Sequence, residues 1–217
     1  MNTDTYTPPL GYKSLTPLYD LVIRYLTREN AWRPALVKQV NPVPGDRILD
    51  VGCGTGSLLA ALAAQCPEAD LIGLDPDIAA LERAANKLKD SNVRLVPGFL
   101  SKESLPKGWL PTKITSSLMF HQVPLMKKTE IVDVMRSLLL PGGELHITDY
   151  AMQKSALMRA AFRATVQQLD GIEDTKHNAG GILERILVAP GYMTEKTLSF
   201  PTATGSISLF KAKFLVS

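Results

Sequence analysis

The chain has 217 residues, of which 45% are hydrophobic and 21% charged, and its formal net charge is +3 at pH 7. A chain of this length forms about one domain, and its apolar content excludes intrinsic disorder. The weak positive charge does not favour nucleic acid, because a duplex-binding domain usually carries a dense basic stripe. We therefore expect no nucleic-acid partner. The 2 cysteines form neither a disulfide framework nor a zinc site, and no carboxylate cluster indicates a metal.

No segment has the character of a signal peptide or a membrane-spanning helix. The N-terminal segment lacks the apolar core of a signal peptide. The longest apolar run, residues 58–64, is far shorter than the ~20 residues needed to span a bilayer. We expect a cytoplasmic protein without integral membrane association. The sequence does not distinguish a monomer from a homodimer.

The first part of the chain is predicted to be an arm followed by helices. Residues 1–14 are polar and contain prolines, which is typical of a loose arm. Over residues 16–40 apolar side chains recur at helical spacing, and Pro34 is expected to begin a second helix, because proline suits a first turn. We expect an N-terminal arm and helical cap over residues 1–40, and one domain over residues 41–217.

Beyond residue 46, short apolar strands alternate with helices. The predicted strands cover residues 47–51, 71–74, 93–96, 114–119, 144–148, 193–200 and 206–214, and the predicted helices cover residues 57–65, 78–89, 127–140, 152–169 and 181–188. Such alternation indicates right-handed βαβ units and a parallel sheet. Only a turn joins the last two strands, so they must pair antiparallel if they pair. The predicted fold is an α/β doubly wound sheet closed by a terminal hairpin.

A glycine-rich loop, Asp-Val-Gly-Cys-Gly-Thr-Gly over residues 50–56, follows the first strand. Its three glycines allow a tight turn and a close approach of the backbone to a ligand. Asp50 places a carboxylate at the bend, and Asp75 at the end of the second strand is suited to accept hydrogen bonds from both hydroxyls of a ribose. The alternative is that the glycines only form a turn and that Asp50 caps the following helix.

The glycine spacing distinguishes between two classes of nucleotide ligand. A dinucleotide-binding loop has the pattern Gly-x-Gly-x-x-Gly, which cradles a pyrophosphate. This loop has the pattern Gly-x-Gly-x-Gly with an acid two residues before it, and a carboxylate suits an ammonium better than a phosphate. A ligand with a ribose, an amino-acid tail and no phosphate fits, namely S-adenosylmethionine. Cys53 is expected to be an ordinary small residue of the turn, because no histidine lies near it in the sequence.

Residues 50–56 resemble motif I of the class I S-adenosylmethionine-dependent methyltransferases, and the resemblance extends over nearly the whole chain. It implies a Rossmann-like seven-stranded sheet in the order 3-2-1-4-5-7-6, mostly parallel with strand 7 antiparallel, and helices on both faces. It also implies roles for side chains of the loop and the second strand. Asp50 faces the methionine amino group and Asp75 holds the ribose. The residues expected to pack along the cofactor are Gly52, Cys53, Gly54 and Gly56.

The resemblance assigns further cofactor contacts and has two departures. Pro76 is expected beside the adenine. The family's Gly-Asp-Ala after the third strand is Gly-Phe-Leu here, so the adenine is held by packing on Phe99, by a backbone carbonyl or by Ser101. Residues 112–113 replace the family's Phe-Asp at the start of the fourth strand. The segment after that strand resembles Ser-x-x-x-x-His-x-x-Pro of small-molecule methyltransferases, and implies that Ser117 and Leu118 contact the methionyl part.

Methyl transfer from a sulfonium mainly requires that the acceptor be held in line, and a phenol, enol or carbon acid also benefits from a general base. His121, just past the fourth strand, is the first candidate for the base; the alternative is that it only orients a loop. Tyr19 resembles an N-terminal tyrosine that covers the cofactor in the quinone- and lipid-methylating branch, or else it packs on the surface. His146 is expected in the core, and His177 in a connection that could cover the acceptor.

The acceptor is expected to be a small molecule. Methionines and aromatic residues at helical spacing could form an adaptable apolar wall, namely Met152, Met158, Phe162 and Leu169. They favour a lipophilic or aromatic acceptor. One alternative is a non-catalytic S-adenosylmethionine-binding module of the same fold. Another is an RNA or protein methyltransferase, although residues 116–119 differ from the Asn-Pro-Pro-Tyr tetrapeptide that such enzymes often carry.

Overall fold

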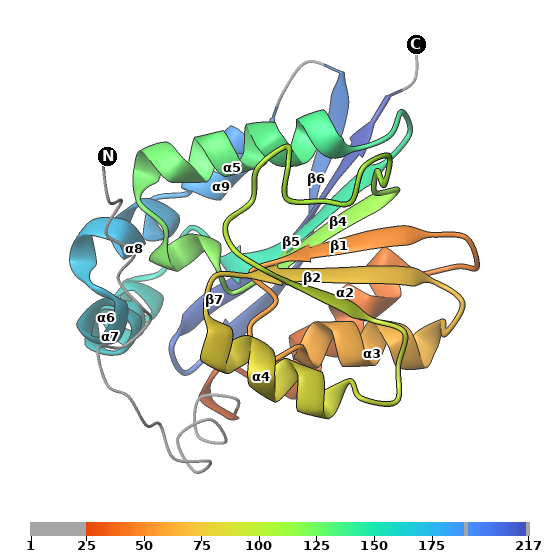
Figure 1. Ribbon diagram of the computed structural model, residues 1–217. Coiled ribbons are helices and arrows are strands. Elements are labelled where there is room, and N and C mark those ends of the chain that lie inside the picture. The colour runs from red at the N-terminus through yellow and green to blue at the C-terminus, as the bar shows by residue number, and fades with distance from the viewer. Residues whose placement is uncertain (1–24, 189–190, 216–217) are drawn as a thin grey trace, which may run out of the picture.

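The computed structural model describes residues 25–188 and 191–215, and its strands form one twisted sheet in the order β3-β2-β1-β4-β5-β7-β6 (Figure 1). The strands are β1 (Arg47–Val51), β2 (Asp70–Asp75), β3 (Arg94–Pro97), β4 (Lys113–Ser117), β5 (Glu144–Tyr150), β6 (Tyr192–Thr202) and β7 (Gly205–Phe214). β1 to β5 are parallel, and β7 runs antiparallel to both β5 and β6. The predicted doubly wound sheet with an antiparallel seventh strand is confirmed.

Helices cover both faces of the sheet (Figure 1). One face carries α2 (Glu29–Val40), α3 (Ser57–Gln65) and α4 (Ile78–Lys87), and the other carries α5 (Leu125–Leu138) and α9 (Ile182–Ile186). Successive side chains of a strand point to opposite faces, so in β1 Ile48 joins the core under α2 and α3, and Leu49 joins the core under α5. Burial on both faces explains why β1 and β2 are rich in consecutive apolar residues.

The prediction that Pro34 begins a helix is wrong. Pro34 lies in the second turn of α2, which begins at Glu29 after Arg28 has turned into the left-handed conformation at φ 53°. The left-handed Arg28 interrupts the chain path, and hydrophobic spacing carries no signal for it. Trp32 and Leu36 of α2 are fully buried against the sheet, so this helix belongs to the domain core.

The single helix predicted over residues 152–169 is also wrong. The structure has α6 (Ala156–Ala164), α7 (Val166–Asp170) and α8 (Ile172–Ala179). Ser155 begins α6 by accepting a hydrogen bond from the N–H of Met158 at 3.1 Å. Thr165 interrupts the helix with φ −120° and ψ −80°, and Gly171, at φ 85°, separates α7 from α8. The stretch expected to be a connection between residues 170 and 180 is therefore mainly helical.

Candidate functional site

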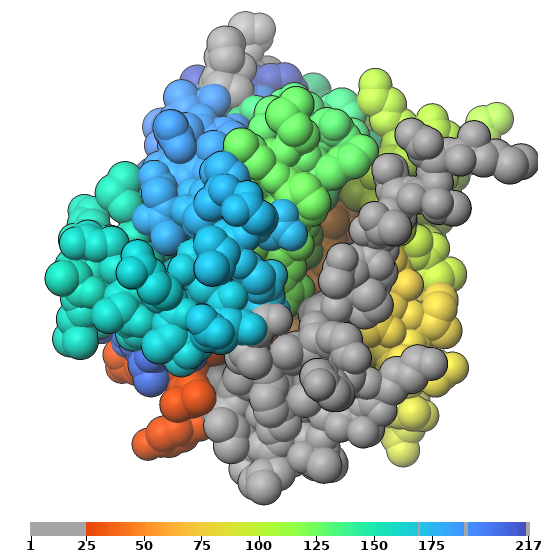
Figure 2. Space-filling view, turned by 90° about the vertical axis from the view of Figure 1, so that its left-hand side faces the viewer, coloured from red at the N-terminus to blue at the C-terminus, as the bar shows by residue number. Residues whose placement is uncertain are grey.

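The carboxyl ends of β1, β2, β4 and β5 lie at the same edge of the sheet, because these strands are parallel and adjacent. α4 lies at one side of this edge and α6 to α8 lie at the other (Figure 2). In the strand register Asp50 is opposite Gly73 of β2 and Thr115 of β4, and Ser117 is opposite Thr148 of β5. Open α/β sheets bind ligands outside this edge, where the strand order reverses.

The glycine loop turns sharply away from β1. Gly52, Gly54 and Gly56 all have positive φ, at 71°, 51° and 71°. A Cβ on Gly52 would lie 2.5 Å from Cγ of Met119, whereas a Cβ on Gly54 would have no atom of the described residues within 4 Å. Gly52 is therefore required by packing as well as by backbone conformation, while Gly54 borders open space that a ligand can approach.

Asp50 does not cap the helix that follows the loop. Its side chain is 1% exposed, and its Oδ1 accepts a hydrogen bond from the hydroxyl of Thr115 at 2.8 Å. Its Oδ2 is buried and has no hydrogen-bond partner among the described residues. Burial raises the pKa of this carboxyl to about 7, against the opposing effects of Thr115 and of the Arg33 charge. A buried oxygen of this kind is costly unless a donor reaches it, and an ammonium group would be such a donor.

Asp75 supports the glycine loop directly. Its Oδ2 accepts the N–H of Gly54 at 2.8 Å, and its Oδ1 accepts the N–H of Asp77 at 2.9 Å. Burial raises the pKa of Asp75, and these two backbone hydrogen bonds oppose the shift. Each carboxylate oxygen keeps lone pairs for a further donor, so both can still accept ribose hydroxyls. The sequence predicted that Asp75 accepts ribose hydroxyls. No feature of the sequence predicted that it also anchors the glycine loop.

The next residues along β2 and β3 border the adenine position that the resemblance implies. Pro76 is half-buried, and Asp77 accepts hydrogen bonds from the first turn of α4. Gly98 donates its N–H to the carbonyl of Asp75 at 3.0 Å, which places the following Phe99 near the end of β2. Phe99 is 62% exposed, whereas the hydroxyl of Ser101 accepts the N–H of Glu103 within its own turn. The choice among packing on Phe99, a backbone carbonyl and Ser101 stays a prediction.

The departure at residues 112–113 lies at the opposite edge of the sheet. Lys113 begins β4, and its ammonium is 2.6 Å from Oδ2 of Asp46 in a largely buried ion pair. Thr112 donates its hydroxyl to Oδ1 of the same carboxylate at 2.7 Å. This cluster joins the amino ends of β1 and β4. The replacement of Phe-Asp therefore does not touch the residues proposed to hold the cofactor.

The end of β4 contains a strained residue. Leu118 has φ 52°, which is uncommon for a side chain other than glycine. Its N–H donates to the carbonyl of Thr148 at 2.8 Å, so the strained turn is held against β5. Ser117 precedes it and is half-buried at the end of β4. Strain of this kind concentrates at ligand sites, which agrees with the contact to the methionyl part that the resemblance implies.

His121 lies between two carboxylates. Its Nδ1 is 2.9 Å from Oδ1 of Asp149 at the end of β5, and its Nε2 is 3.5 Å from Oδ2 of Asp170 at the end of α7. Burial alone would lower the pKa of His121, but the two carboxylates outweigh it and raise the pKa to about 9. A ring that keeps its proton at neutral pH cannot accept another, which favours the orienting alternative over the general base. Tyr19 lies outside the described residues.

The other candidate residues are buried or half-buried. His146 is fully buried in β5, with Nε2 3.2 Å from Oε2 of Glu144. Burial and the nearby carboxylates raise the pKa of Cys53, so its thiol is not poised as a nucleophile. Phe162 was expected in an acceptor wall, but it is 1% exposed and packs against Tyr150 in the core. His177 is half-buried on α8.

Two residues that the sequence did not single out join the site region. Lys128 in the first turn of α5 is fully buried and donates to the carbonyls of Val123 and Asp174 at 2.6 and 2.8 Å. Burial lowers the pKa of Lys128 to about 8. Asp170 contacts His121 from the C-terminal end of α7, one residue past the end of the predicted helix. No feature of the sequence predicted that either residue lies in the site, because charged residues at helical positions usually face solvent.

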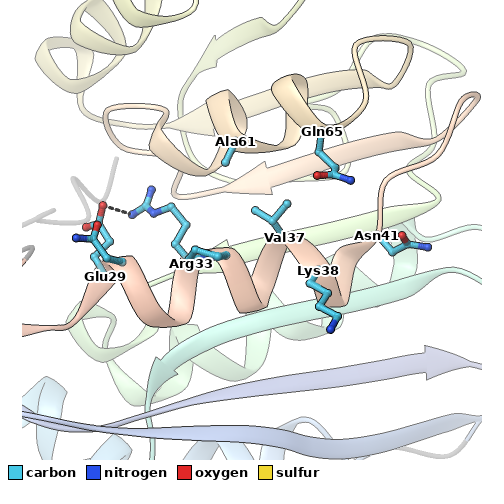
Figure 3. A pocket seen from close by; sticks show the side chains of 9 residues that line it. Glu29, Arg33, Val37, Lys38, Asn41, Ala61 and Gln65 are labelled. Atoms are coloured by element: carbon cyan, nitrogen blue, oxygen red, sulfur yellow. Dashed lines mark ion pairs between the residues drawn. The ribbon is translucent and has the colours of Figure 1, made fainter.

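A groove of about 460 Å³ runs between α2 and α3 (Figure 3). At one end of it Arg33 pairs with Glu29 at 3.1 Å, and the groove continues past Val37 toward Gln65 (Figure 3). Its lining includes neither Asp50 nor Asp75. Among the described residues no three His, Cys, Asp or Glu side chains are grouped to hold a metal ion. Within the same residues no helix is both long and apolar enough to cross a membrane.

Comparison with known proteins gives matches among methyltransferases. Residues 48–143 match the family described as a methyltransferase domain. The chain is 28% identical over 159 residues to the ubiquinone/menaquinone biosynthesis C-methyltransferase UbiE of Syntrophotalea carbinolica, covering 72% of this chain and 66% of that protein. It is 26% identical over 194 residues to the demethylmenaquinone methyltransferase of Deinococcus radiodurans, covering 88% and 77%.

Solved structures share the fold. The plantazolicin methyltransferase BpumL superposes with a TM-score of 0.65 at 16% identity, over 92% of both chains. The YcgJ protein of Bacillus subtilis gives a TM-score of 0.68 at 13% identity, over 85% of this chain and 98% of that one. Together with the sheet order and the acidic glycine loop, these sequence matches support a class I S-adenosylmethionine-dependent methyltransferase.

Proposed function

We propose that this chain transfers the methyl group of S-adenosylmethionine to a small lipophilic or aromatic acceptor. The observation that carries the proposal is the buried carboxylate of Asp50, whose Oδ2 has no partner among the described residues and lies at the bend of the glycine loop. The ammonium of the amino-acid tail would supply the missing donor. Asp75 would accept the ribose hydroxyls, and the open space beside Gly54 would admit the ligand.

When bound, S-adenosylmethionine would supply an electrophilic methyl group: an acceptor atom bonds to the methyl carbon in line with the breaking C–S bond, and S-adenosylhomocysteine leaves as the neutral thioether. The chain's contribution is mainly to bind and orient. Asp50 would hold the amino-acid tail and Asp75 the ribose, and the strained turn at Leu118 brings the end of β4 beside the glycine loop. Arg33 of α2 is close enough to lower the pKa of Asp50, and its charge favours the carboxylate of the amino-acid tail.

Two observations support an apolar acceptor. The relatives from Syntrophotalea carbinolica and Deinococcus radiodurans carry names of quinone-biosynthesis methyltransferases and align with 72% and 88% of this chain. In addition, the part of the chain on the other side of the edge from α4 exposes large apolar side chains: Met152, in the loop before α6, is 41% exposed, Leu157 on α6 72% and Ile172 on α8 54%. Hydroquinones and other phenols are therefore the first acceptors to test.

Calorimetric titration with S-adenosylmethionine, S-adenosylhomocysteine and NADH tests the cofactor assignment. Binding of the first two ligands and not of NADH is expected, and no binding of either sulfur ligand would contradict it. A panel of reduced naphthoquinones, benzoquinols and simple phenols, with S-adenosylhomocysteine formation as the readout, then tests the acceptor. Cofactor binding without turnover on any acceptor would favour the non-catalytic module. Turnover on RNA or protein alone would favour the macromolecular alternative.

A further inference from the structure

His121 connects two parts of the site that differ in how firmly they are held. Asp149, on one side of its ring, is fully buried at the end of β5, which pairs with β4 and β7. Its Oδ1 also accepts the N–H of Tyr150 at 2.7 Å. Asp170, on the other side of the ring, ends α7 just before Gly171. The imidazole thus joins the rigid sheet to the segment of α7 and α8, residues 166–179.

The segment 166–179 is attached at its α7 end by Val166, which is buried in the core under α2 and α3, and at its α8 end mainly through polar contacts. The two buried side chains of α8, Thr175 and Asn178, are both polar. Asn178 donates to the carbonyl of Tyr150 at 2.9 Å, and the buried Lys128 donates to the carbonyl of Asp174 at 2.8 Å. Segments that bury few apolar side chains open at low free-energy cost. Each polar contact therefore contributes to the free energy needed to open this segment.

Both contacts of His121 at once require the charged ring. A neutral imidazole has one N–H, so one of its nitrogens would present a lone pair to a carboxylate. The imidazolium donates from both nitrogens and also separates the charges of Asp149 and Asp170. The groups that face the ring or its partners are these carboxylates, the Tyr150 ring edge-on at 5.0 Å, the amide of Gln122, which donates to Asp170 at 3.3 Å, and the Lys128 ammonium.

We propose that His121 is a positioning residue, which clamps the segment 166–179 over the acceptor side of the site by bridging Asp149 and Asp170. This proposal rests on the proposed function, since the acceptor side is defined by it. A clamped segment excludes water and narrows the space in which an acceptor can lie. His121 then acts through Asp170 and the segment, and takes no proton from the acceptor.

The protonation state can be measured without any acceptor. The chain has 3 histidines, so labelling histidine with nitrogen-15 gives a simple spectrum, and His177→Gln helps to assign it. Both ring nitrogens of His121 are expected to be protonated at about pH 7.5. A neutral tautomer at that pH would overturn the proposal. Adding S-adenosylhomocysteine tests the cofactor site in the same sample, so failure of the proposed function is seen separately.

Hydrogen–deuterium exchange tests the clamp. Asp170→Asn removes the charge from the segment and keeps the shape of the side chain, and Glu173→Gln is the matched control, because Glu173 is exposed and pairs with Lys176 on the same helix. Asp170→Asn and His121→Gln should each raise exchange in residues 166–179 by about tenfold, while the control stays near wild type. S-adenosylhomocysteine affinity should change little. Unchanged exchange in Asp170→Asn would overturn the clamp even if His121→Gln fails to fold.

Kinetics separate positioning from proton transfer once an acceptor is known. Loss of the clamp should raise the KM for the acceptor and leave kcat at saturation within a few-fold of wild type. A general base would instead show its main loss in kcat, by about 10²-fold or more. A large loss of kcat in His121→Gln, with unchanged exchange and a neutral ring, would therefore assign His121 to the chemistry.

Discussion

The carboxylate of Asp75 accepts the N–H of Gly54 at 2.8 Å, so the end of β2 holds the glycine loop that follows β1. The other oxygen of Asp75 accepts the N–H of Asp77, which begins the turn into α4. One side chain thus shapes the loop and offers its remaining lone pairs to the ribose. Loop geometry and cofactor affinity consequently depend on the same group.

Asp75→Ala should weaken the binding of S-adenosylhomocysteine at least about tenfold, because the loop loses its anchor and the ribose loses its acceptor. Asp75→Asn keeps one oxygen acceptor and should lose less. Calorimetric titration of both variants against wild type makes the comparison. An affinity of Asp75→Ala equal to wild type would remove Asp75 from the ribose site.

Cofactor affinity should depend on pH through Asp50. Burial raises its pKa to about 7 in the ligand-free protein, so below about pH 7 the carboxyl must release a proton before it can pair with an ammonium. Affinity for S-adenosylmethionine should fall by up to about tenfold per pH unit below that value. Titration in buffers of different ionisation enthalpy would detect the released proton. Asp50→Asn should bind weakly, with little dependence on pH over this range.

Because its buried carboxyl ionises, Asp50 should destabilise the ligand-free fold. Its folded pKa of about 7 lies above the ordinary value of 3.8, so its effect on stability is most favourable at low pH and is lost as pH rises through about 7. At about pH 8, Asp50→Asn should increase the free energy of unfolding by about 1 to 3 kcal/mol, while it weakens cofactor binding. Urea denaturation measures this, and a destabilised variant would show that Oδ2 has a partner in the free protein.

Two glycines of the loop should respond differently to alanine. In Gly52→Ala the new methyl overlaps Met119 at 2.5 Å, so we expect a loss of about 2 to 3 kcal/mol in unfolding free energy. In Gly54→Ala the methyl meets no atom of residues 25–188 or 191–215, so we expect a cost of about 1 kcal/mol from backbone strain. Cofactor affinity should nevertheless fall in Gly54→Ala, because the methyl enters the ligand's space. Denaturation and calorimetry on both variants test this, and retained affinity in Gly54→Ala would move the ligand away from the loop.

Periodicity and glycine spacing predict the sheet well. Strands buried on both faces and a tight strand–helix turn each require a recognisable residue pattern within a short segment. β1 and α3 are predicted at their observed bounds, and β2 and β5 within two residues. The predicted helix boundaries are wrong where a backbone conformation that hydrophobic spacing does not indicate begins or interrupts a helix. Arg28 in the left-handed conformation moves the start of α2, and Thr165 breaks a helix without proline or glycine.

The candidate site also has a part that the sequence predicts and a part that it does not. Asp50 and Asp75 follow from sequence, because each ends or nearly ends a strand at one edge of the sheet. The surroundings of His121 do not, because Asp149 and Asp170 are 28 and 49 residues away along the chain, and Asp170 reaches the ring through helix packing. A histidine past β4 is read equally well as a base or as an orienting group until its neighbours are known.

The contribution of His121 to stability should fade at high pH. Its folded pKa of about 9 lies above the ordinary value of 6.5, so the stabilisation is complete below about pH 6.5 and is lost as pH rises through about 9. At about pH 6, wild type should exceed His121→Gln by on the order of 3 kcal/mol in unfolding free energy, and the difference should shrink by about pH 10. Asp170→Asn removes one of the two charges that raise the pKa, so in that background the loss should begin at lower pH. Urea denaturation across this range makes the test, and a difference independent of pH would mean that the ring is neutral in the native state.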